Sequence, residues 1–273
     1  MSALTDWGLS LRDWGVPDEI LAKAKESPWG LPPELMRRRA ERAADLSPST
    51  SLRRARGALP DGGSVLDVGV GGGAASLPLV PPAARIVGVD GSQELLGVFE
   101  AAARRLGVET VAVLGSWPDA ADRVERADVV VCSHVLYNVQ DLDPFVRALD
   151  DHARRRVVVE ITERHPLAWM SDLWRRFHGL VRPDHPTADD AHAALREMGL
   201  DARREDETRP PRSSGFERRE DAVALVRRRL CLTEDRDEEL AEALGDRLIE
   251  RDGLWSAGPA EQTVVTLWWD RVT

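Results

Sequence analysis

The sequence predicts an α/β fold, a doubly wound sheet of mostly parallel strands with helices on both faces. From Ser64 onward, short β-branched runs alternate with helix-like stretches, which is the pattern of a parallel sheet. The runs are nearly continuous in valine and isoleucine, as expected for strands buried on both faces. A glycine-rich turn follows the first run, at the edge where such sheets bind ligands.

Residues 1–60 are predicted to form a cover of short helices, ahead of a sheet domain that spans residues 61–273. Helix signals begin at Pro17 and Pro32, and a third helix is predicted with Ser47 as N-cap and Pro48 at its first position. Several tryptophans here and further on are candidates for an aromatic substrate pocket, with core packing as the alternative. They are Trp7, Trp14, Trp29, Trp169 and Trp174.

Five strand-like runs come next along the chain. They are SVLDV from Ser64, RIVGVD from Arg85, TVAVLG from Thr110, ADVVVCS from Ala127 and RVVVEI from Arg156. Between the first two, SLPLVPPAA contains three prolines, which predicts a shortened helix because proline cannot donate a helical hydrogen bond.

The alternation stops after Ile161. Residues 166–190, approximately, are predicted to be a helical insertion that forms a lid or pocket wall. Then come a capped helix (PTADDAHAALREMG), a polar extended run (ARREDETR) and two helices, FERREDAVALVRRRL and EDRDEELAEALGDRLIE. The final TVVTLWWDR is predicted to be a strand, on which Trp268 and Trp269 must face opposite sides.

Composition narrows the class of protein. The 273 residues contain 37 Lys+Arg and 47 Asp+Glu, and the net charge of -10 would repel a nucleic-acid backbone. Cys132 and Cys231 lack C-x-x-C spacing, which is typical of a reducing cytosol and offers no zinc site. The N-terminus lacks a signal-peptide pattern, and no apolar run approaches membrane-spanning length. We expect a soluble cytoplasmic protein; the sequence leaves its oligomeric state open.

The stretch VLDVGVGGGAAS, which begins at Val65, is suited to either a dinucleotide or S-adenosylmethionine. Gly69-x-Gly71-x-x-Ala74 satisfies the dinucleotide pattern. Asp67 discriminates better, because a carboxylate beside the loop would repel a pyrophosphate but attract the ammonium and sulfonium of S-adenosylmethionine. The spacing of Asp67, Gly69, Gly71 and Gly73 therefore favours S-adenosylmethionine.

Polar residues follow the later strands at the same edge of the predicted sheet. Asp90 ends the second strand, where it can accept both ribose hydroxyls of an adenosine cofactor of either kind. Ser116 and Trp117 follow the third strand, where they are suited to holding an adenine ring. Ser133 and His134 end the fourth strand.

The segment from Val65 to Ile161 resembles a class I S-adenosylmethionine-dependent methyltransferase. The resemblance implies a Rossmann-like seven-stranded sheet whose antiparallel last strand lies beside the fifth. It implies that the D-x-G-x-G-x-G loop holds the methionine part of the cofactor, although Ser116 departs from the acidic or amide group that many members place near adenine. The predicted cofactor-binding residues are Asp67, Val68, Gly69, Gly71, Gly73, Asp90, Gly91, Ser92, Gly115, Ser116, Trp117, Ser133, His134 and Val135.

An acceptor that carries a proton needs a base, and several titratable residues follow the fourth and fifth strands. The first candidate is His134, because histidine accepts a proton near neutrality. The second is Tyr137, for which a pocket wall is the alternative. Others are Glu160, Glu163 and His165. His178 and His185 have no partner ligands at a recognisable spacing, so we predict no metal.

The sequence lacks the N-P-P-Y or D-P-P-Y segments of nucleic-acid and glutamine methyltransferases, and Cys132 is not preceded by proline. Together with the acidic charge, this favours a small-molecule acceptor. We predict methyl transfer from S-adenosylmethionine to oxygen, nitrogen or carbon, releasing S-adenosylhomocysteine. The alternatives are an NAD(P)-dependent oxidoreductase, a non-catalytic S-adenosylmethionine-binding regulator, and a methyltransferase acting on RNA or protein.

Overall fold

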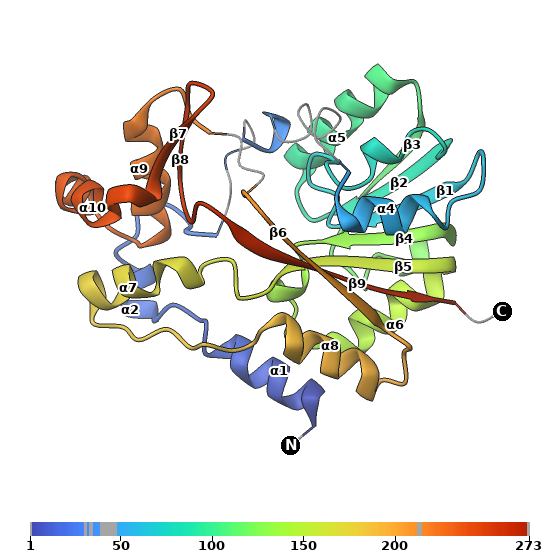
Figure 1. The fold of residues 1–273 in the computed structure, drawn as a ribbon, viewed down its shortest axis with the longest axis horizontal. Coiled ribbons are helices and arrows are strands. Elements are labelled where there is room, and N and C mark those ends of the chain that lie inside the picture. The colour runs from blue at the N-terminus through green and yellow to red at the C-terminus, as the bar shows by residue number, and fades with distance from the viewer. Residues whose placement is uncertain (1, 30–31, 33–34, 39–47, 212–214, 272–273) are drawn as a thin grey trace.

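A computed structural model describes residues 2–29, 32, 35–38, 48–211 and 215–271. Its centre is a seven-stranded sheet in the order β3-β2-β1-β4-β5-β9-β6 (Figure 1). The strands are β1 (Ser64–Val68), β2 (Arg85–Asp90), β3 (Glu109–Leu114), β4 (Ala127–Ser133), β5 (Ala153–Thr162), β6 (Arg203–Arg209) and β9 (Gln262–Asp270).

The pairing directions confirm the predicted sheet. Strands β1 to β5 pair in parallel, whereas β9 is antiparallel to both β5 and β6. The last strand therefore lies beside the fifth, as the sequence predicted. Because β9 reverses direction, β6 again runs parallel to β5, and its carboxyl end reaches the same edge of the sheet.

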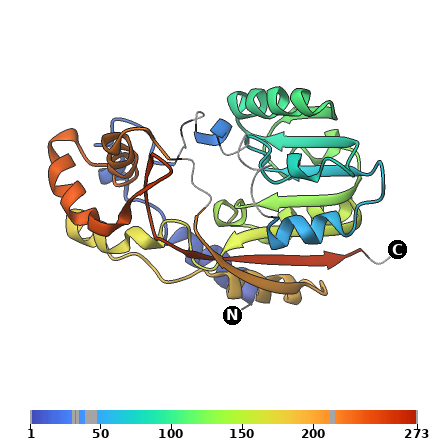
Figure 2. The ribbon, with the colours of Figure 1, turned by 45° about the horizontal axis from the view of Figure 1, so that its top comes forward.

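Helices cover both faces of the sheet (Figure 2). One hydrophobic cluster contains residues of α4 (Thr50–Arg56) and α5 (Gln93–Leu106). The other cluster contains residues of α1 (Ala3–Arg12), α6 (Leu142–His152) and α8 (Ala188–Glu197). Trp268 belongs to the first cluster and Trp269 to the second, so the two rings face opposite sides, as predicted.

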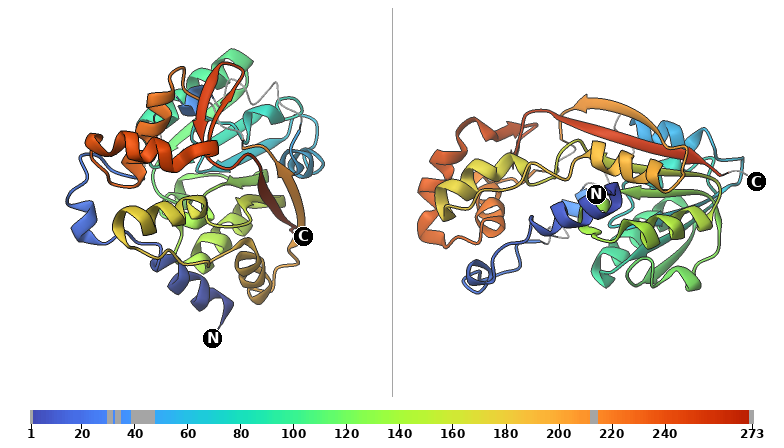
Figure 3. Two further views of the ribbon diagram at one scale, coloured as in Figure 1. Left: turned by 60° about the vertical axis from the view of Figure 1, so that its left-hand side comes forward. Right: turned by 90° about the horizontal axis from the view of Figure 1, so that it is seen from below.

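A third hydrophobic cluster builds a second lobe beside the sheet (Figure 3). The lobe combines α7 (Ser171–His178) from the insertion with α9 (Arg219–Arg229) and α10 (Asp237–Leu244). The hairpin of β7 (Leu248–Arg251) and β8 (Leu254–Ala257) and the short α2 (Asp18–Leu21) complete it. The insertion thus shares its core with helices far along the chain.

Three predicted helix boundaries are wrong. The helix predicted from Phe216 begins at Arg219, because the Phe216 backbone pairs with Trp255. The helix predicted through Glu250 ends at Leu244, because Gly245 takes a φ of 49° and the residues after it pair as β7. The helix predicted to begin at Pro48 begins at Thr50, because the Ser49 hydroxyl accepts the hydrogen bond of the Leu52 amide at 3.2 Å.

Other helix predictions near the N-terminus have mixed outcomes. The predicted N-cap Ser47 and much of the helix predicted from Pro32 lie outside the described residues. The helix predicted from Pro17 covers only Asp18–Leu21. The shortened helix predicted after the glycine loop is confirmed as a single 3₁₀ turn, Leu77–Leu79. Within the described ranges, every helix is too short or too polar to cross a membrane.

Trp7 ties α1 to the sheet, and its replacement tests that packing. The fully buried indole donates to the Val139 carbonyl at 2.8 Å and stacks on Tyr137 at 5.6 Å between ring centroids. We expect Trp7→Ala to lower the free energy of unfolding by about 3 to 5 kcal/mol, measured by urea denaturation. Trp29→Ala, at a ring 51% exposed, should change it by less than about 0.5 kcal/mol. Similar losses in both variants would contradict this packing.

Candidate active site

The glycine loop after β1 has a backbone that side chains would block. Gly69, Gly71 and Gly73 have φ values of 75°, 51° and 86°, which residues with a side chain rarely adopt. A Cβ atom on Gly69 would lie 2.4 Å from a methyl of Val135, and one on Gly73 would lie 2.6 Å from Leu77. The glycine loop is therefore packed tightly between the turn after β4 and the 3₁₀ turn Leu77–Leu79, which follows the loop in sequence.

Asp67 is buried without a partner beside this loop. The residue is fully buried, and neither carboxylate oxygen makes a hydrogen bond of good geometry with the described residues; the nearby Ser76 hydroxyl offsets only part of the cost of burial. Burial raises the pKa of Asp67 to about 7, because the charged form is poorly solvated there. A positive charge placed beside this carboxylate would stabilise its ionised form. The site therefore fits a cationic group and disfavours a phosphate.

Asp90 joins the glycine loop to the next helix. One carboxylate oxygen accepts the Gly71 amide at 2.9 Å, and the other accepts the Ser92 amide at 2.9 Å. Ser92 is the N-cap of α5. Each carboxylate oxygen keeps a second lone pair, so Asp90 can still accept hydrogen bonds from two ribose hydroxyls. Gly91 is exposed beside it, with no atom within 4 Å of the position that a Cβ would occupy.

The residues after β3 divide into a packed and an exposed part. The Trp117 indole donates to the Phe145 carbonyl at 3.2 Å and meets the His152 ring edge-on at 5.0 Å. It therefore packs against α6. Ser116 is exposed, and the Gly115 amide donates to the Asp90 carbonyl at 3.0 Å. The adenine contact of these residues stays a prediction.

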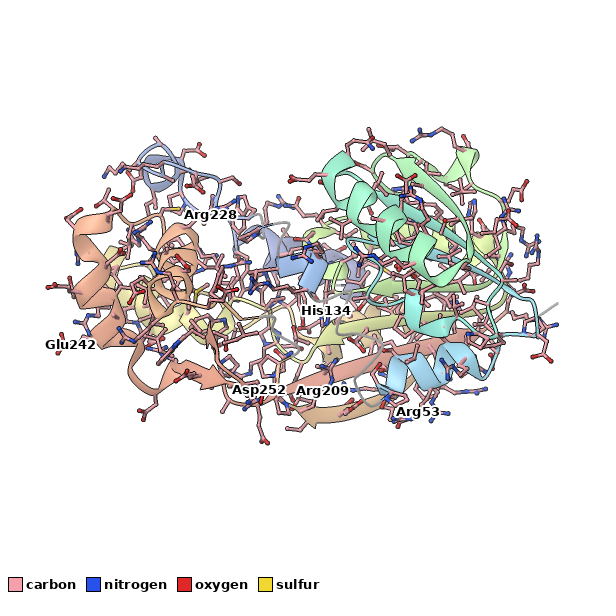
Figure 4. All side chains as sticks on the ribbon, turned by 90° about the horizontal axis from the view of Figure 1, so that it is seen from above. Arg53, His134, Arg209, Arg228, Glu242 and Asp252 are labelled. Carbon is pink, nitrogen blue, oxygen red and sulfur yellow. The ribbon has the colours of Figure 1, made fainter. Side chains whose placement is uncertain are left out.

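His134 and Glu160 meet where β4 and β5 end. His134 has a φ of 59°, an uncommon conformation for a residue with a side chain, and its amide donates to the Glu160 carbonyl at 2.7 Å. Its Nε2 lies 3.2 Å from a Glu160 carboxylate oxygen. Figure 4 places His134 and Arg209 near the middle of the molecule, between the sheet and the second lobe.

Two further donors hold Glu160, and the sequence did not indicate either of them. Arg209, at the end of β6, donates through Nη2 at 3.2 Å, and the Ser51 hydroxyl of α4 donates to the other carboxylate oxygen. Burial alone would raise the pKa of Glu160, but His134, Arg209 and Ser51 together lower it to about 2. Glu160 is thus an ionised partner of these groups and cannot act as a base near neutrality. Ser51 and Arg209 lie far from Glu160 in sequence, so no spacing signals the cluster.

The placement of Tyr137 does not support its predicted catalytic role. The residue is 4% exposed, and its hydroxyl donates to the Thr162 carbonyl at 2.8 Å. Burial also raises the pKa of Tyr137 above its usual range, which disfavours the phenolate. Tyr137 therefore serves as a packing residue that joins the end of β5 to Trp7.

The other candidates for the base are also unsuitable or unsupported. His165 stacks on Trp14 at 3.8 Å, and burial lowers the pKa of this imidazole to about 3, so it stays neutral. Glu163 is exposed and uses its backbone to pair with Thr263 and Ala188. Among the described candidates, His134 alone combines an accessible imidazole with a carboxylate partner.

The tryptophans predicted to line an aromatic pocket, and the remaining histidines, mostly contact other parts of the protein instead. Trp14 and Trp174 are buried on either side of the Arg182 guanidinium, which lies 4.9 and 5.1 Å from their rings. His178 pairs with the Leu230 carbonyl, and His185 with Asp190. The described part of the chain contains no cluster of three His, Cys, Asp or Glu that could hold a metal ion.

Residues 36–204, more than half of the chain, match the protein family described as methyltransferase domain. The chain belongs to this family. The match confirms the resemblance that the sequence predicted. It also decides between the two ligands of the glycine loop in favour of S-adenosylmethionine, against the dinucleotide.

Curated relatives match shorter parts of this methyltransferase-family chain. A ubiquinone biosynthesis O-methyltransferase of Azorhizobium caulinodans is 37% identical over 83 residues, covering 30% of this chain and 33% of the relative. Another, of Aeromonas salmonicida, is 31% identical over 112 residues, covering 40% and 47%. An uncharacterised Haemophilus influenzae protein is 32% identical over 104 residues, covering 37% and 38%. The matches thus span less than half the length of these relatives.

Solved structures share the fold at low sequence identity. A Bacillus halodurans protein assigned as a methyltransferase has a TM-score of 0.53 at 15% identity, covering 82% of this chain and 97% of its own. The YcgJ protein of Bacillus subtilis has a TM-score of 0.52 at 16% identity, covering 82% and 98%. These likenesses confirm the Rossmann-like methyltransferase fold and, at such identities, nothing finer.

Replacing Gly69 tests the tight packing of the loop. We expect Gly69→Ala to abolish measurable binding of S-adenosylhomocysteine in calorimetry and to lower the melting temperature, because its Cβ would collide with Val135. Gly97→Ala is the matched control, since it lies in α5 with open space around it. That variant should bind normally and be equally or more stable. Normal binding by Gly69→Ala would show that the loop has more room than described.

Replacing Asp67 tests the cost of its burial. The pKa of Asp67 rises from 3.8 to about 7 on folding, so the ligand-free chain should lose stability as the pH rises through this range. The difference in unfolding free energy between Asp67→Asn and the wild type should therefore shift in favour of the variant by roughly 2 to 3 kcal/mol from pH 5 to pH 8. Urea denaturation across that range measures the difference. The exposed Asp201→Asn control should follow the wild type, and parallel curves for Asp67→Asn would contradict the burial cost.

Proposed function

We propose that the chain transfers a methyl group from S-adenosylmethionine to a small-molecule acceptor, releasing S-adenosylhomocysteine. The observation that carries the proposal is the buried Asp67 carboxylate, which lacks a well-formed hydrogen bond and a cation, beside a loop whose glycines exclude side chains. A buried carboxylate without a partner is costly, and the ammonium group of this cofactor would offset that cost. The family match supports the same cofactor.

Each part of the cofactor has residues suited to it. Asp67 and the glycine loop suit the methionine part, Asp90 the ribose, and the segment from Gly115 to Ser116 the adenine. When bound, S-adenosylmethionine supplies an electrophilic methyl group on its sulfonium. The chain then needs only to orient the acceptor, exclude water and receive any proton that the acceptor loses.

The acceptor is proposed to be a small molecule with a reactive oxygen, nitrogen or carbon. The net charge of -10 disfavours a nucleic-acid backbone, and two of the curated relatives named above are O-methyltransferases, which favours oxygen. His134 is the proposed base, because its imidazole is 39% exposed at the end of β4. The two buried free cysteines suit a reducing cytoplasm, where we propose that the protein acts.

A non-catalytic S-adenosylmethionine-binding regulator is the second candidate. The burial of Tyr137 favours this candidate, because it reduces the proposed bases among the described residues to His134. Such a regulator would bind the cofactor but methylate none of the acceptors offered.

Calorimetry with S-adenosylhomocysteine, NADH and NADPH tests the proposal. We expect micromolar binding of the first and none of the others. Asp90→Ala should weaken that binding by about 1 to 3 kcal/mol, because the ribose hydrogen bonds are lost. Asp201→Ala, at an exposed position away from the site, should bind like the wild type. Binding of a nicotinamide nucleotide alone would overturn the proposal; tight binding without turnover on a broad acceptor panel would support the regulator.

A further inference from the structure

Glu160 is a buried carboxylate that three other elements converge on. Its side chain is 9% exposed. His134 approaches it from the end of β4, Arg209 from the end of β6 and Ser51 from α4. Burying a carboxylate costs free energy unless donors surround it. The Glu160 cluster therefore depends on all of these groups being in place, which makes its geometry specific.

The contact between His134 and Glu160 favours one of the two imidazole nitrogens as the carrier of the proton. Nε2 of His134 lies 3.2 Å from a Glu160 oxygen, and an ionised carboxylate can only accept hydrogen bonds. In the neutral imidazole the proton therefore sits on Nε2, and Nδ1 keeps its lone pair. Within the described ranges no group contacts Nδ1 by a hydrogen bond, and the imidazole is partly exposed.

The His134 backbone reinforces this arrangement. Its φ of 59° is strained for a residue with a side chain, and the same residue donates its amide to the Glu160 carbonyl. Both the backbone and the side chain of His134 are thus tied to one residue of the neighbouring strand. Strained residues held in this way cluster at functional sites.

The charges around the pair keep Glu160 ionised. Among the described residues, the Arg209 guanidinium lies against the Glu160 carboxylate, in addition to the His134 imidazole. The acidic side chains two and four residues earlier on β6 are engaged elsewhere: Glu207 accepts from the Thr50 amide and hydroxyl, and Glu205 pairs with Arg54. Thr266 of β9, opposite Glu160, is uncharged.

We propose that Glu160 is a positioning residue that presents Nδ1 of His134 as the base, and that the acceptor is therefore a hydroxyl compound. This inference rests on the proposed methyl transfer. In the step, the acceptor oxygen gains the methyl group and loses its proton, the methyl–sulfur bond breaks, and the proton moves to Nδ1. Glu160 stays ionised throughout and stabilises the resulting imidazolium. A hydroxyl needs this base because it is a weak nucleophile until its proton is removed.

Nuclear magnetic resonance of ¹⁵N-histidine-labelled protein with bound S-adenosylhomocysteine tests the pairing without an acceptor. His134→Gln assigns the signal. In the wild type we expect the neutral imidazole to be protonated at Nε2; protonation at Nδ1 would overturn the proposal. In Glu160→Gln the preference for Nε2 should be weakened, because a neutral amide can donate as well as accept a hydrogen bond. An unchanged tautomer signature in this variant would also overturn the proposal.

The pair formed by His185 and Asp190, at 2.8 Å, provides the matched control. Asp190→Asn removes a carboxylate from an exposed histidine outside the site, and should leave the His134 signals unchanged. A shift of His134 in this variant equal to that in Glu160→Gln would show a global effect and contradict the local pairing. The wild-type tautomer decides the question even if Glu160→Gln does not fold.

Kinetics on a panel of phenols and catechols provides the second readout. Glu160→Gln should lower kcat by about 10- to 100-fold while KM stays within about twofold. Wild-type kcat in this variant would overturn the inference. Failure to bind S-adenosylhomocysteine would defeat the proposed function itself, whereas normal binding with a His134 signal independent of Glu160 would defeat only the inference.

Discussion

The cost of burying a carboxylate in a parallel sheet governs the carboxyl edge of this fold. Two acidic residues lie inside strands at this edge, and their pKa values are shifted in opposite directions. Asp67 makes no hydrogen bond of good geometry with the described residues, and burial raises its pKa to about 7 despite the nearby Ser76 hydroxyl. Glu160 has donors from three other elements, which lower its pKa to about 2. The second environment is completed by the protein, whereas a bound cation would complete the first.

The topology explains why Glu160 can be satisfied. Its neighbours along the sheet are β4 on one side and β9 on the other. The antiparallel β9 allows β6 to run parallel to β5 again, so Arg209 arrives at the edge where His134 ends β4. A wholly parallel sheet would need a crossover connection at this position. The reversal therefore supplies a cation to the same edge that holds the glycine loop.

Much of the sheet and the cofactor loop was predictable, because both depend on local patterns. Each valine-rich run, the glycine spacing and the acid that ends the second run at Asp90 can be recognised from a short stretch of neighbouring residues. The cluster around Glu160 was not, since Ser51 and Arg209 approach it only through tertiary pairing. Tyr137 failed as a catalytic candidate for a related reason: its position after β4 is local, whereas the contacts with Trp7 and Thr162 that bury it are not. Strand β7 was missed because Leu248–Glu250 continue the helix-like pattern before them, and only the turn at Gly245 and the pairing with β8 stop the helix.

The Asp67 and Glu160 carboxylates could also balance the positive charges that the proposed methyl transfer involves. In the ligand-free chain, Asp67 is partly protonated near neutrality, so a cationic cofactor bound beside it would displace that proton. Under the proposed function the site would then hold two ionised carboxylates, a cationic cofactor and Arg209. A proton taken from an acceptor hydroxyl would turn His134 into a cation next to Glu160. The counter-ion of that imidazolium is already in place in the folded chain, so the proposed proton transfer would need no further ion beside His134.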